Sequence, residues 1–190
     1  MIWPALILGL GGLMLAGAAS AQNVEAGRKV AGMCRTCHGL DGLAVMPVAP
    51  NIGGEPAAYL AAQLEAFRSG ARVNEMMSVV AAGLSDQQIA DVAAWYAAHT
   101  ATAVPPPAFD AAAAPEACVA CHGADGIAVI DEAPNLAGEN AIYIDTQLKA
   151  FRGGKRASEI MTPVAEGLDD AAIRAAADWY AAVGLEVASP

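Results

Sequence analysis

The chain has 190 residues, a formal net charge of −10 and an aromatic content of only 5%. An acidic chain without a basic patch excludes nucleic-acid binding as its main function. Hydrophobic residues make up 56% of the sequence, but much of this fraction is alanine, which favours helices and provides little side-chain volume for a core. We therefore expect small helical domains that need a bulky apolar group to complete their interior.

The N-terminus begins with an apolar run over residues 2–19 that leads into an Ala-Ser-Ala sequence at residues 19–21. This pattern predicts a secretory signal peptide, residues 1–21, that is cleaved to leave a mature chain beginning near Gln22. No Lys or Arg precedes the run, and about 18 apolar residues can span a membrane, so a retained anchor is the alternative. In both cases the rest of the chain is exported, and we expect a periplasmic protein.

The exported part consists of two copies of one sequence, related by an offset of 84 residues without a gap. Each copy contains a Cys-x-x-Cys-His-Gly-x-Asp-Gly motif near its start, and the histidines of these motifs are His38 and His122. Self-similarity at a fixed period indicates a tandem duplication. The boundary falls in residues 101–107, where three consecutive prolines form a short, stiff connector. We predict two domains, residues 22–104 and residues 105–190.

The first repeat is predicted to contain helices connected by loops. A helix over residues 25–33 leads into the motif, and a Gly- and Pro-rich loop follows over residues 39–55. Pro56 begins a second helix with an apolar stripe, and Gly70 ends it. Ser85, with a glutamine three residues later, predicts a capping box at the start of the last helix.

The second repeat copies the last two helices, with Asp169 as the predicted cap of the final one. It departs at Pro115, three residues before Cys118, so its first helix must be short or begin at this proline. Neither repeat contains an alternating strand pattern of useful length. The expected fold is therefore all-α, with two tandem helical domains joined by a short Pro-rich linker.

The four cysteines all belong to the two Cys-x-x-Cys-His motifs. Structural disulfides are the simplest expectation for an exported chain, but this spacing is the attachment signature of c-type haem. Zinc is the main rival, although each domain lacks a second Cys or His pair to complete a tetrahedral site. His99 corresponds to Val183 in the other repeat and is expected at the surface. We expect two covalently bound haem c groups, whose iron sites involve Cys34, Cys37 and His38, and Cys118, Cys121 and His122.

The second axial ligand of each iron decides between an electron carrier and a catalyst. The first domain offers four methionines: Met33, Met46, Met76 and Met77. Only Met77 has a methionine counterpart, Met161, so these two are the expected ligands opposite His38 and His122. Filling both axial positions leaves no open site for peroxide or oxygen, which favours electron transfer.

Further matched pairs are expected to support the haems. The carbonyl groups of Pro50 and Pro134 follow the motifs and can accept the hydrogen bond from the proximal histidine ring. Other pairs are candidates for hydrogen-bonding or balancing the charge of the haem propionates: Tyr59 and Tyr143, Gln63 and Gln147, Arg68 and Arg152. For the two tyrosines, ordinary core packing is the alternative. The terminal-helix pairs Trp95 and Trp179, and Tyr96 and Tyr180, are expected to pack that helix.

These motifs resemble class I cytochromes c, and their tandem arrangement resembles the cytochrome c4 family of dihaem proteins. The resemblance covers nearly the whole exported chain and includes the Ala-Pro-Asn loop, the Tyr-x-x-x-Gln-Leu-x-x-Phe-Arg helix and the methionine before the last helix. It implies two haem domains related by a pseudo-twofold axis, with the propionate edges near the interface. Family members are periplasmic, sometimes membrane-associated, which here would involve residues 2–19. Their partners are terminal oxidases, cytochrome bc1-type complexes or dehydrogenases.

We therefore predict an electron carrier rather than an enzyme. The alternatives are a subunit tightly bound to a dehydrogenase, as in flavocytochrome c, and a dihaem peroxidase, which would need a displaceable ligand on one iron. The predicted domains differ in charge, because residues 22–104 contain five basic and seven acidic residues and residues 105–190 contain five and thirteen. The acidic second domain is expected to steer docking onto a basic partner surface.

Overall fold

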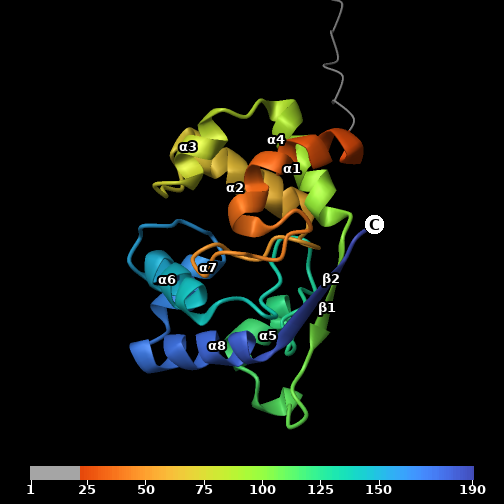
Figure 1. The fold of residues 1–190 in the computed structure, drawn as a ribbon. Helices are drawn as coiled ribbons and strands as arrows, with labels where there is room; N and C mark the ends of the chain where they lie inside the picture. The colour runs from red at the N-terminus through yellow and green to blue at the C-terminus, as the bar shows by residue number, and fades with distance from the viewer. Residues whose placement is uncertain (1–21) are drawn as a thin grey trace, which may run out of the picture.

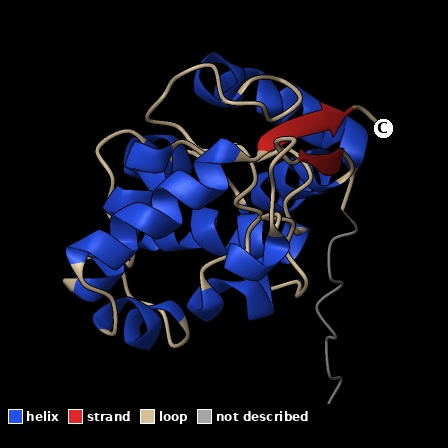
Figure 2. Cartoon of the chain, turned by 90° about the horizontal axis from the view of Figure 1, so that it is seen from below, coloured by secondary structure: helices blue, strands red, loops and turns tan. Residues whose placement is uncertain are grey.

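The computed structural model describes residues 22–190, and the predicted signal segment at residues 1–21 lies outside this range. The described chain forms two helical halves with long loops between them and a two-stranded ribbon along one side (Figures 1 and 2). No helix among these residues is long and apolar enough to cross a membrane.

The first half contains four helices: α1 (Val24–His38), α2 (Ala57–Ser69), α3 (Met77–Ala82) and α4 (Asp86–Ala97). The side chain of Asn23 accepts the backbone N–H of Ala26 and so caps α1, which continues through the Cys-x-x-Cys-His motif. The predicted ends are confirmed for α2, which starts after Pro56 and ends at Gly70 in a left-handed conformation (φ 80°). The capping box at Ser85 is also present.

The second half contains a short 3-10 turn and four α-helices: η1 (Ala111–Ala113), α5 (Glu116–His122), α6 (Ala141–Arg152), α7 (Met161–Glu166) and α8 (Asp170–Ala182). As predicted, Pro115 shortens the first of these, because α5 begins directly after it and has 7 residues against 15 in α1. Asp169 caps α8 through the N–H of Ala172. The sequence did not predict α3 and α7, since 6 residues are too few to show helical periodicity.

Each half has its own hydrophobic core. In the first half, α1 packs across α4, and α2 packs against α3 and α4. In the second half, α6 packs against α7 and α8. The most deeply buried large side chains are Tyr180, Ile89, Ile173, Val92 and Val183. All five lie in α4 or α8 or directly after α8, so the last helix of each half is at the centre of its core.

The predicted all-α fold of two tandem helical domains is confirmed, and a two-stranded antiparallel ribbon that the sequence did not predict joins the halves. Strand β1 (Thr100–Val104) pairs with β2 (Gly184–Ala188), which lies at the far end of the sequence. In this register Thr102 pairs with Glu186, its own counterpart at the repeat offset of 84. A backbone bridge likewise pairs Arg72 with its counterpart Arg156. Both pairs show that the halves are related by a pseudo-twofold axis.

The strands escaped prediction because each has 5 residues, mostly small, and neither has its partner nearby in the sequence. The first four residues of the expected linker, 101–104, are part of β1, and the prolines follow it. The ribbon rests against the loops between the halves: a Cβ on Gly54 would lie 2.6 Å from the Cβ of Ala101. The matched Gly138 would similarly meet Leu185 at 2.7 Å. These close approaches require glycine.

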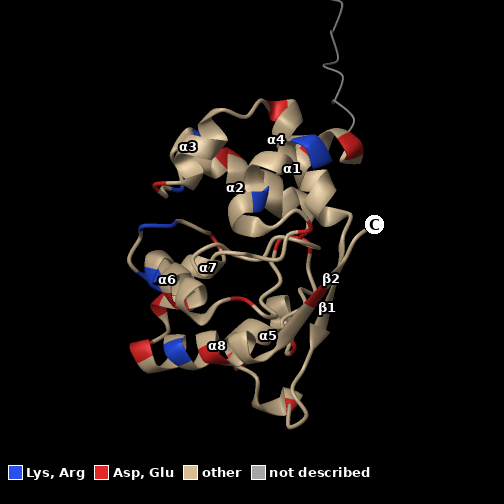
Figure 3. Ribbon diagram, viewed as in Figure 1, with Lys and Arg blue, Asp and Glu red and all other residues tan. Residues whose placement is uncertain are grey.

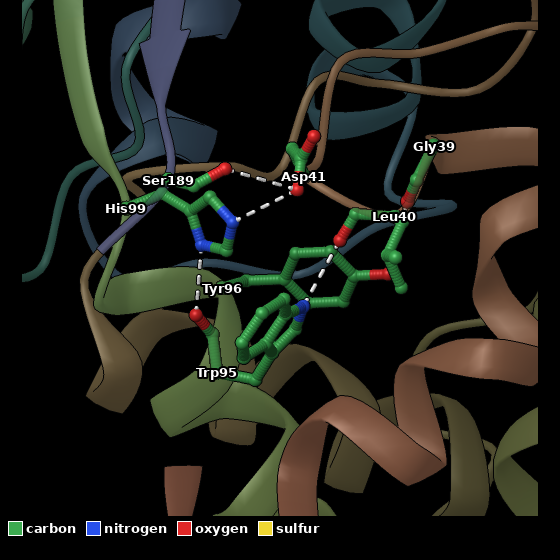
Figure 4. A network of polar contacts seen from close by, with 7 residues as sticks. All are labelled: Gly39, Leu40, Asp41, Trp95, Tyr96, His99 and Ser189. Atoms are coloured by element: carbon green, nitrogen blue, oxygen red, sulfur yellow. Dashed lines mark hydrogen bonds and ion pairs between the residues drawn. The ribbon is translucent and has the colours of Figure 1, made fainter. Parts of the chain in front are cut away.

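The surface position expected for His99 is wrong, because its side chain is buried where α4 leads into β1 (Figure 4). Its Nδ1 donates to the carbonyl oxygen of Trp95 at 2.9 Å, and its ring packs edge-on against the indole. Its Nε2 lies 3.4 Å from the carboxylate of Asp41, which Ser189 also contacts at 3.4 Å. His99 therefore connects α4 to the loop after the first motif and to the C-terminal segment.

The crossing of α1 over α4 depends on Gly27, where a Cβ would lie 1.9 Å from the carbonyl oxygen of Asp91. We expect Gly27→Ala to lower the free energy of unfolding by about 1–3 kcal/mol, as overpacking does in other cores. Gly32→Ala in the same helix is the control, because no atom lies within 4 Å of its added Cβ. That change should raise the free energy of unfolding by about 0.5–1 kcal/mol. Denaturant unfolding followed by circular dichroism measures both, and equal effects would contradict the close crossing.

Candidate haem sites

The two Cys-x-x-Cys-His motifs form the C-terminal ends of α1 and α5. Three-residue spacing on a helix places the two cysteines of each motif on one face, with the histidine beside them. All four cysteines are free thiols and line the same cavity. The arrangement leaves each pair of thiols available for covalent attachment to a group in that cavity.

His38 and His122 are buried, and each is held by the hydrogen bond that the sequence predicted. The Nδ1 atom of His38 donates to the carbonyl oxygen of Pro50, and that of His122 to Pro134, each at 2.8 Å. Because Nδ1 is used, Nε2 is the nitrogen with which each ring can bind a metal. Burial lowers the pKa of both imidazoles, although the hydrogen bonds to the prolines oppose this. The neutral form required of a metal ligand is therefore favoured.

The cavity between the halves has a volume of about 800 Å³ and a largely apolar lining. Both motifs contribute to it, from opposite halves. Among the described residues, no group of three or more His, Cys, Asp or Glu side chains could hold a bare metal ion. A porphyrin supplies four nitrogen ligands of its own, so a single histidine and one further axial ligand are sufficient. The thiols, the neutral histidines and the apolar cavity together fit haem and do not fit zinc.

The methionines at the start of α3 and α7 both line the cavity. The backbone N–H of Met77 donates to Asn74 Oδ1, and that of Met161 to Ser158 Oγ, both at 3.0 Å. Met46 and Met76 also line the cavity, whereas Met33 is 57% exposed and does not. The repeat distinguishes among these methionines. Met161 is the sole methionine of the second half, and its counterpart at the offset of 84 is Met77. Met77 and Met161 remain the candidate axial ligands.

The tyrosines and glutamines expected near the propionates line the cavity and form one network across the twofold axis. The guanidinium group of Arg72 donates to Gln63 of its own half (2.7 Å) and to Tyr143 (3.1 Å) and Gln147 (2.8 Å) of the other. Arg156 makes the equivalent bonds: Gln147 at 2.8 Å, Tyr59 at 3.2 Å and Gln63 at 2.9 Å. The two tyrosines are thus polar groups of the interface rather than simple core residues.

The role expected for Arg68 and Arg152 is wrong, since neither side chain lines the cavity. Arg68 donates to the carbonyl of Leu84 at 3.0 Å and pairs with Asp86 at 2.6 Å. Arg152 makes the matching contacts with the carbonyl of Leu168 and with Asp170. Both arginines hold the start of the last helix onto the second, and because their bonds are already made, they do not reach the haem pocket.

Arg72 and Arg156 are the arginines that sequence reasoning missed, although they match at the repeat offset. Each guanidinium packs over a phenylalanine ring at 4.4 Å. The side chains that accept hydrogen bonds from these groups are all neutral, and none of the ion pairs of the described chain includes either arginine. Two adjacent cations in a buried interface are costly without an anion. The carboxylates of haem would supply that anion, which is a second reason the site fits this group.

Glu55 and Glu139 are a second pair without an assigned role in the sequence. Both are buried, and each accepts a backbone N–H from the opposite half: Oε2 of Glu139 from Asn51 and Oε2 of Glu55 from Asn135, each at 2.9 Å. Burial raises the pKa of Glu55 to about 8 and that of Glu139 to about 7. The repeat match at these positions was visible, but only the folded chain reveals that each carboxyl group serves the other half.

The hydrogen bonds of Trp95 and Trp179 agree with the packing role expected for the last helix of each half. Their indole N–H groups donate to the carbonyls of Leu40 (2.9 Å) and Ala124 (2.8 Å), directly after the motifs. The hydroxyl groups of Tyr96 and Tyr180 similarly reach the carbonyls of the glycines that follow the two histidines. The last helix of each half therefore fixes the loop that leaves the motif.

Comparison with known proteins agrees with this geometry. The family model described as cytochrome c matches residues 24–98 and 110–180. The thiosulfate dehydrogenase electron acceptor of Stutzerimonas stutzeri is 36% identical over 96% of this chain and 95% of that protein. Cytochrome c4 of Pseudomonas aeruginosa is 31% identical over 86% of both chains.

Two solved structures have the same fold. Reduced cytochrome c4 from Pseudomonas stutzeri superposes with a TM-score of 0.74 at 28% identity, covering 86% of this chain and 100% of that one. Thiosulfate dehydrogenase from Marichromatium purpuratum superposes with a TM-score of 0.72 at 34% identity, covering 84% of this chain and 40% of that one. The two-half architecture is therefore common to proteins with both of these names.

The raised pKa values of Glu55 and Glu139 predict that the stability of the protein depends on pH. Their pKa values in the folded chain lie above the ordinary value of 4.5, so the folded state retains protons that the unfolded state has released. Their contribution to the free energy of unfolding is therefore complete below about pH 4.5 and is lost as pH rises to about 8. Each pKa unit of difference corresponds to about 1.4 kcal/mol.

We expect the double variant Glu55→Gln, Glu139→Gln to lose this part of the pH dependence, because glutamine does not titrate. Denaturant unfolding of the haem-loaded protein at several pH values between about 5 and about 8 measures it. Glu65→Gln is the control, since Glu65 is exposed. A double variant that keeps the slope of the parent protein would contradict the assignment.

Proposed function

The chain belongs to the cytochrome c family and carries two covalently bound haem c groups, and we propose that it works in the periplasm between a substrate-oxidising dehydrogenase and a respiratory acceptor such as a terminal oxidase. It is an electron carrier with redox partner proteins and not itself an enzyme. One observation carries the proposal: both motifs open onto one cavity between the halves. An electron that enters through one half can therefore leave through the other.

The roles proposed for the residues follow from their positions. Cys34, Cys37, Cys118 and Cys121 attach the two haems, and each bound haem supplies an iron that alternates between the ferric and ferrous states. His38 and Met77 would bind one iron, and His122 and Met161 would bind the other. A methionine ligand in addition to the histidine would raise the reduction potential and leave no open position for oxygen or peroxide. Arg72 and Arg156, with the tyrosines and glutamines around them, hold the haem carboxylates.

A dehydrogenase is the proposed electron donor. Two similarities support this choice: a relative named as an electron acceptor of thiosulfate dehydrogenase aligns along nearly the whole chain, and a thiosulfate dehydrogenase structure contains the same two-half fold as 40% of its length. A dehydrogenase that oxidises thiosulfate is the first to test. The second similarity also favours the alternative that this chain is a permanently bound subunit. Copurification of the two proteins at a fixed ratio would distinguish a subunit from a free carrier.

The first test concerns the axial methionines. Wild-type protein should contain two low-spin haems, and Met77→Ala and Met161→Ala should each convert one of them to a centre of lower reduction potential, because the thioether ligand is lost. A spectroscopic redox titration of the purified protein measures both centres. Met33→Ala is the control, since that side chain is exposed and outside the cavity. If neither variant loses a centre, the axial assignment is wrong.

The second test concerns docking. Figure 3 shows acidic residues along α8 and beside α6, in the half with thirteen acidic and five basic residues. We expect reduction of the protein by thiosulfate dehydrogenase and thiosulfate to slow as ionic strength rises, because steering by charge is screened. Stopped-flow absorbance measures the rate. Glu159→Gln should slow association at low salt more than Glu75→Gln, its exposed counterpart in the first half. Rates that do not change with salt would contradict the docking model.

A further inference from the structure

One peptide group in each half carries hydrogen bonds at both of its ends. The carbonyl oxygen of Pro50 accepts the Nδ1–H of His38 at 2.8 Å, and the N–H of the same peptide, which belongs to Asn51, donates to Glu139 of the other half at 2.9 Å. The equivalent path runs from His122 through the peptide between Pro134 and Asn135 to Glu55, with the same two distances. Each proximal histidine is therefore connected to a buried carboxyl group of the opposite half through a single peptide.

We propose that Glu139 and Glu55 are positioning residues for the opposite half, which set the electron-donor strength of His38 and His122 and thereby the reduction potential of each haem. The inference rests on the proposed role of these histidines as iron ligands. Negative charge at the N–H end of a peptide polarises its carbonyl group and strengthens the bond that this carbonyl accepts. A histidine whose Nδ1–H is bonded more strongly is a more basic ligand and stabilises ferric iron. The ionised carboxylate thus lowers the potential of the haem in the other half.

The path is held in place by further contacts across the interface. The side-chain amide of Asn51 donates to the carbonyl of Gly138 at 3.0 Å, while its oxygen accepts the N–H of Ala44 at 2.9 Å. Asn135 does the same with Gly54 at 3.1 Å and Ala128 at 2.9 Å. Because each asparagine side chain is anchored on both sides, the peptide that precedes it has a fixed orientation. The coupling therefore depends on the assembled interface and not on either half alone.

The two paths are not equivalent, because the residue after each glutamate differs. Glu139 also accepts the backbone N–H of Asn140 at 2.8 Å through Oε1. Glu55 is followed by Pro56, which has no N–H to donate. Burial raises the pKa of both carboxyl groups. The additional bond opposes this at Glu139, while repulsion from Glu139 adds to it at Glu55, in agreement with a pKa of about 7 for Glu139 against about 8 for Glu55. Near neutral pH the carboxylate is thus more populated on the path to His38 than on the path to His122.

Other charged groups share the cavity with the two carboxyl groups. Glu139 itself repels Glu55, which raises the pKa of Glu55 further. The remaining charged side chains that share the cavity are Arg72, Arg156, Asp131 and Glu132, together with the carboxylates of the bound haems. A charge elsewhere in the cavity leaves the hydrogen bond from each glutamate to one particular peptide unchanged, so the path still selects which haem responds.

Redox titration of the haem-loaded protein as a function of pH tests the proposal. In wild type the potential of the first-half centre should fall as pH rises through about 7, and that of the second-half centre through about 8. Glu139→Gln keeps an acceptor for Asn51 but removes the charge, so it should raise the first-half potential and flatten its pH dependence. Glu55→Gln should do the same for the second half. Each tenfold difference in the acid dissociation constant of the glutamate between the ferric and ferrous states changes the reduction potential by about 59 mV.

A proton resonance gives a direct readout of the path. In the reduced, diamagnetic protein, the Nδ1–H signal of His38 should move upfield in Glu139→Gln, while that of His122 moves less. Retained protection of the Asn51 amide from hydrogen exchange would show that the interface is intact. Equal shifts of both potentials, or an unchanged His38 signal, would overturn the proposal in favour of charge acting through space. A failure of the axial assignment would instead appear in the methionine variants.

A second test replaces Asn140 with proline, the residue at the matching position of the first half. Asn140 has φ −65° and ψ 128°, close to the φ −56° and ψ 131° of Pro56, so Asn140→Pro fits the backbone that is already present. It removes the second hydrogen bond of Glu139 and should move the pH midpoint of the first-half centre upward, toward that of the second half. An unchanged midpoint would contradict the role given to this bond.

Discussion

The structure depends on one reciprocal contact, in which the loop after each motif is held by the other half. The histidine of a haem site is oriented by a carbonyl, and the peptide that contains this carbonyl is bonded at its other end to a glutamate across the interface. A site of this kind is not complete within one half. The cavity is likewise lined by both halves, so neither half encloses a haem environment by itself. The interface is thus part of the haem sites as well as a contact between domains.

The twofold relation between duplicated halves also brings like residues together. A residue close to the axis meets its own copy, so Arg72 pairs with Arg156, and Glu55 repels Glu139. Two nearby charges of the same sign in a buried place require compensation. The glutamates are compensated by a raised pKa, which favours the neutral form. Arginine cannot lose its proton in this way, so its charge needs an anion, and the carboxylates of haem fit that requirement.

The repeat in the sequence was sufficient to predict much of this fold. Helix ends at Pro56, Gly70 and Asp169 were predicted correctly, because caps and breakers act within a few residues. The hydrogen bond from His38 to Pro50 was also predictable, since Pro50 lies in the loop that directly follows the motif at the end of α1. The errors share a different physical origin. The pairing of β1 with β2, the burial of His99 and the separation of Arg68 from the cavity all depend on contacts between segments far apart in the chain. Repeat matching shows that a residue is retained, but it does not show which of two nearby arginines faces the cavity.

The differences between the halves are as informative as the matches. A perfectly symmetric pair of haem sites would have equal potentials and would give no direction to electron transfer. Three differences break that symmetry: Pro115 shortens the first helix of the second half, the second half carries most of the negative charge, and Pro56 stands where the second half has Asn140. The first affects packing, and the second acts at long range and is screened by salt. The third changes one hydrogen bond in a buried path that leads to a single histidine. It is therefore a single-residue change through which the two haems can acquire different potentials without altering the fold that they share.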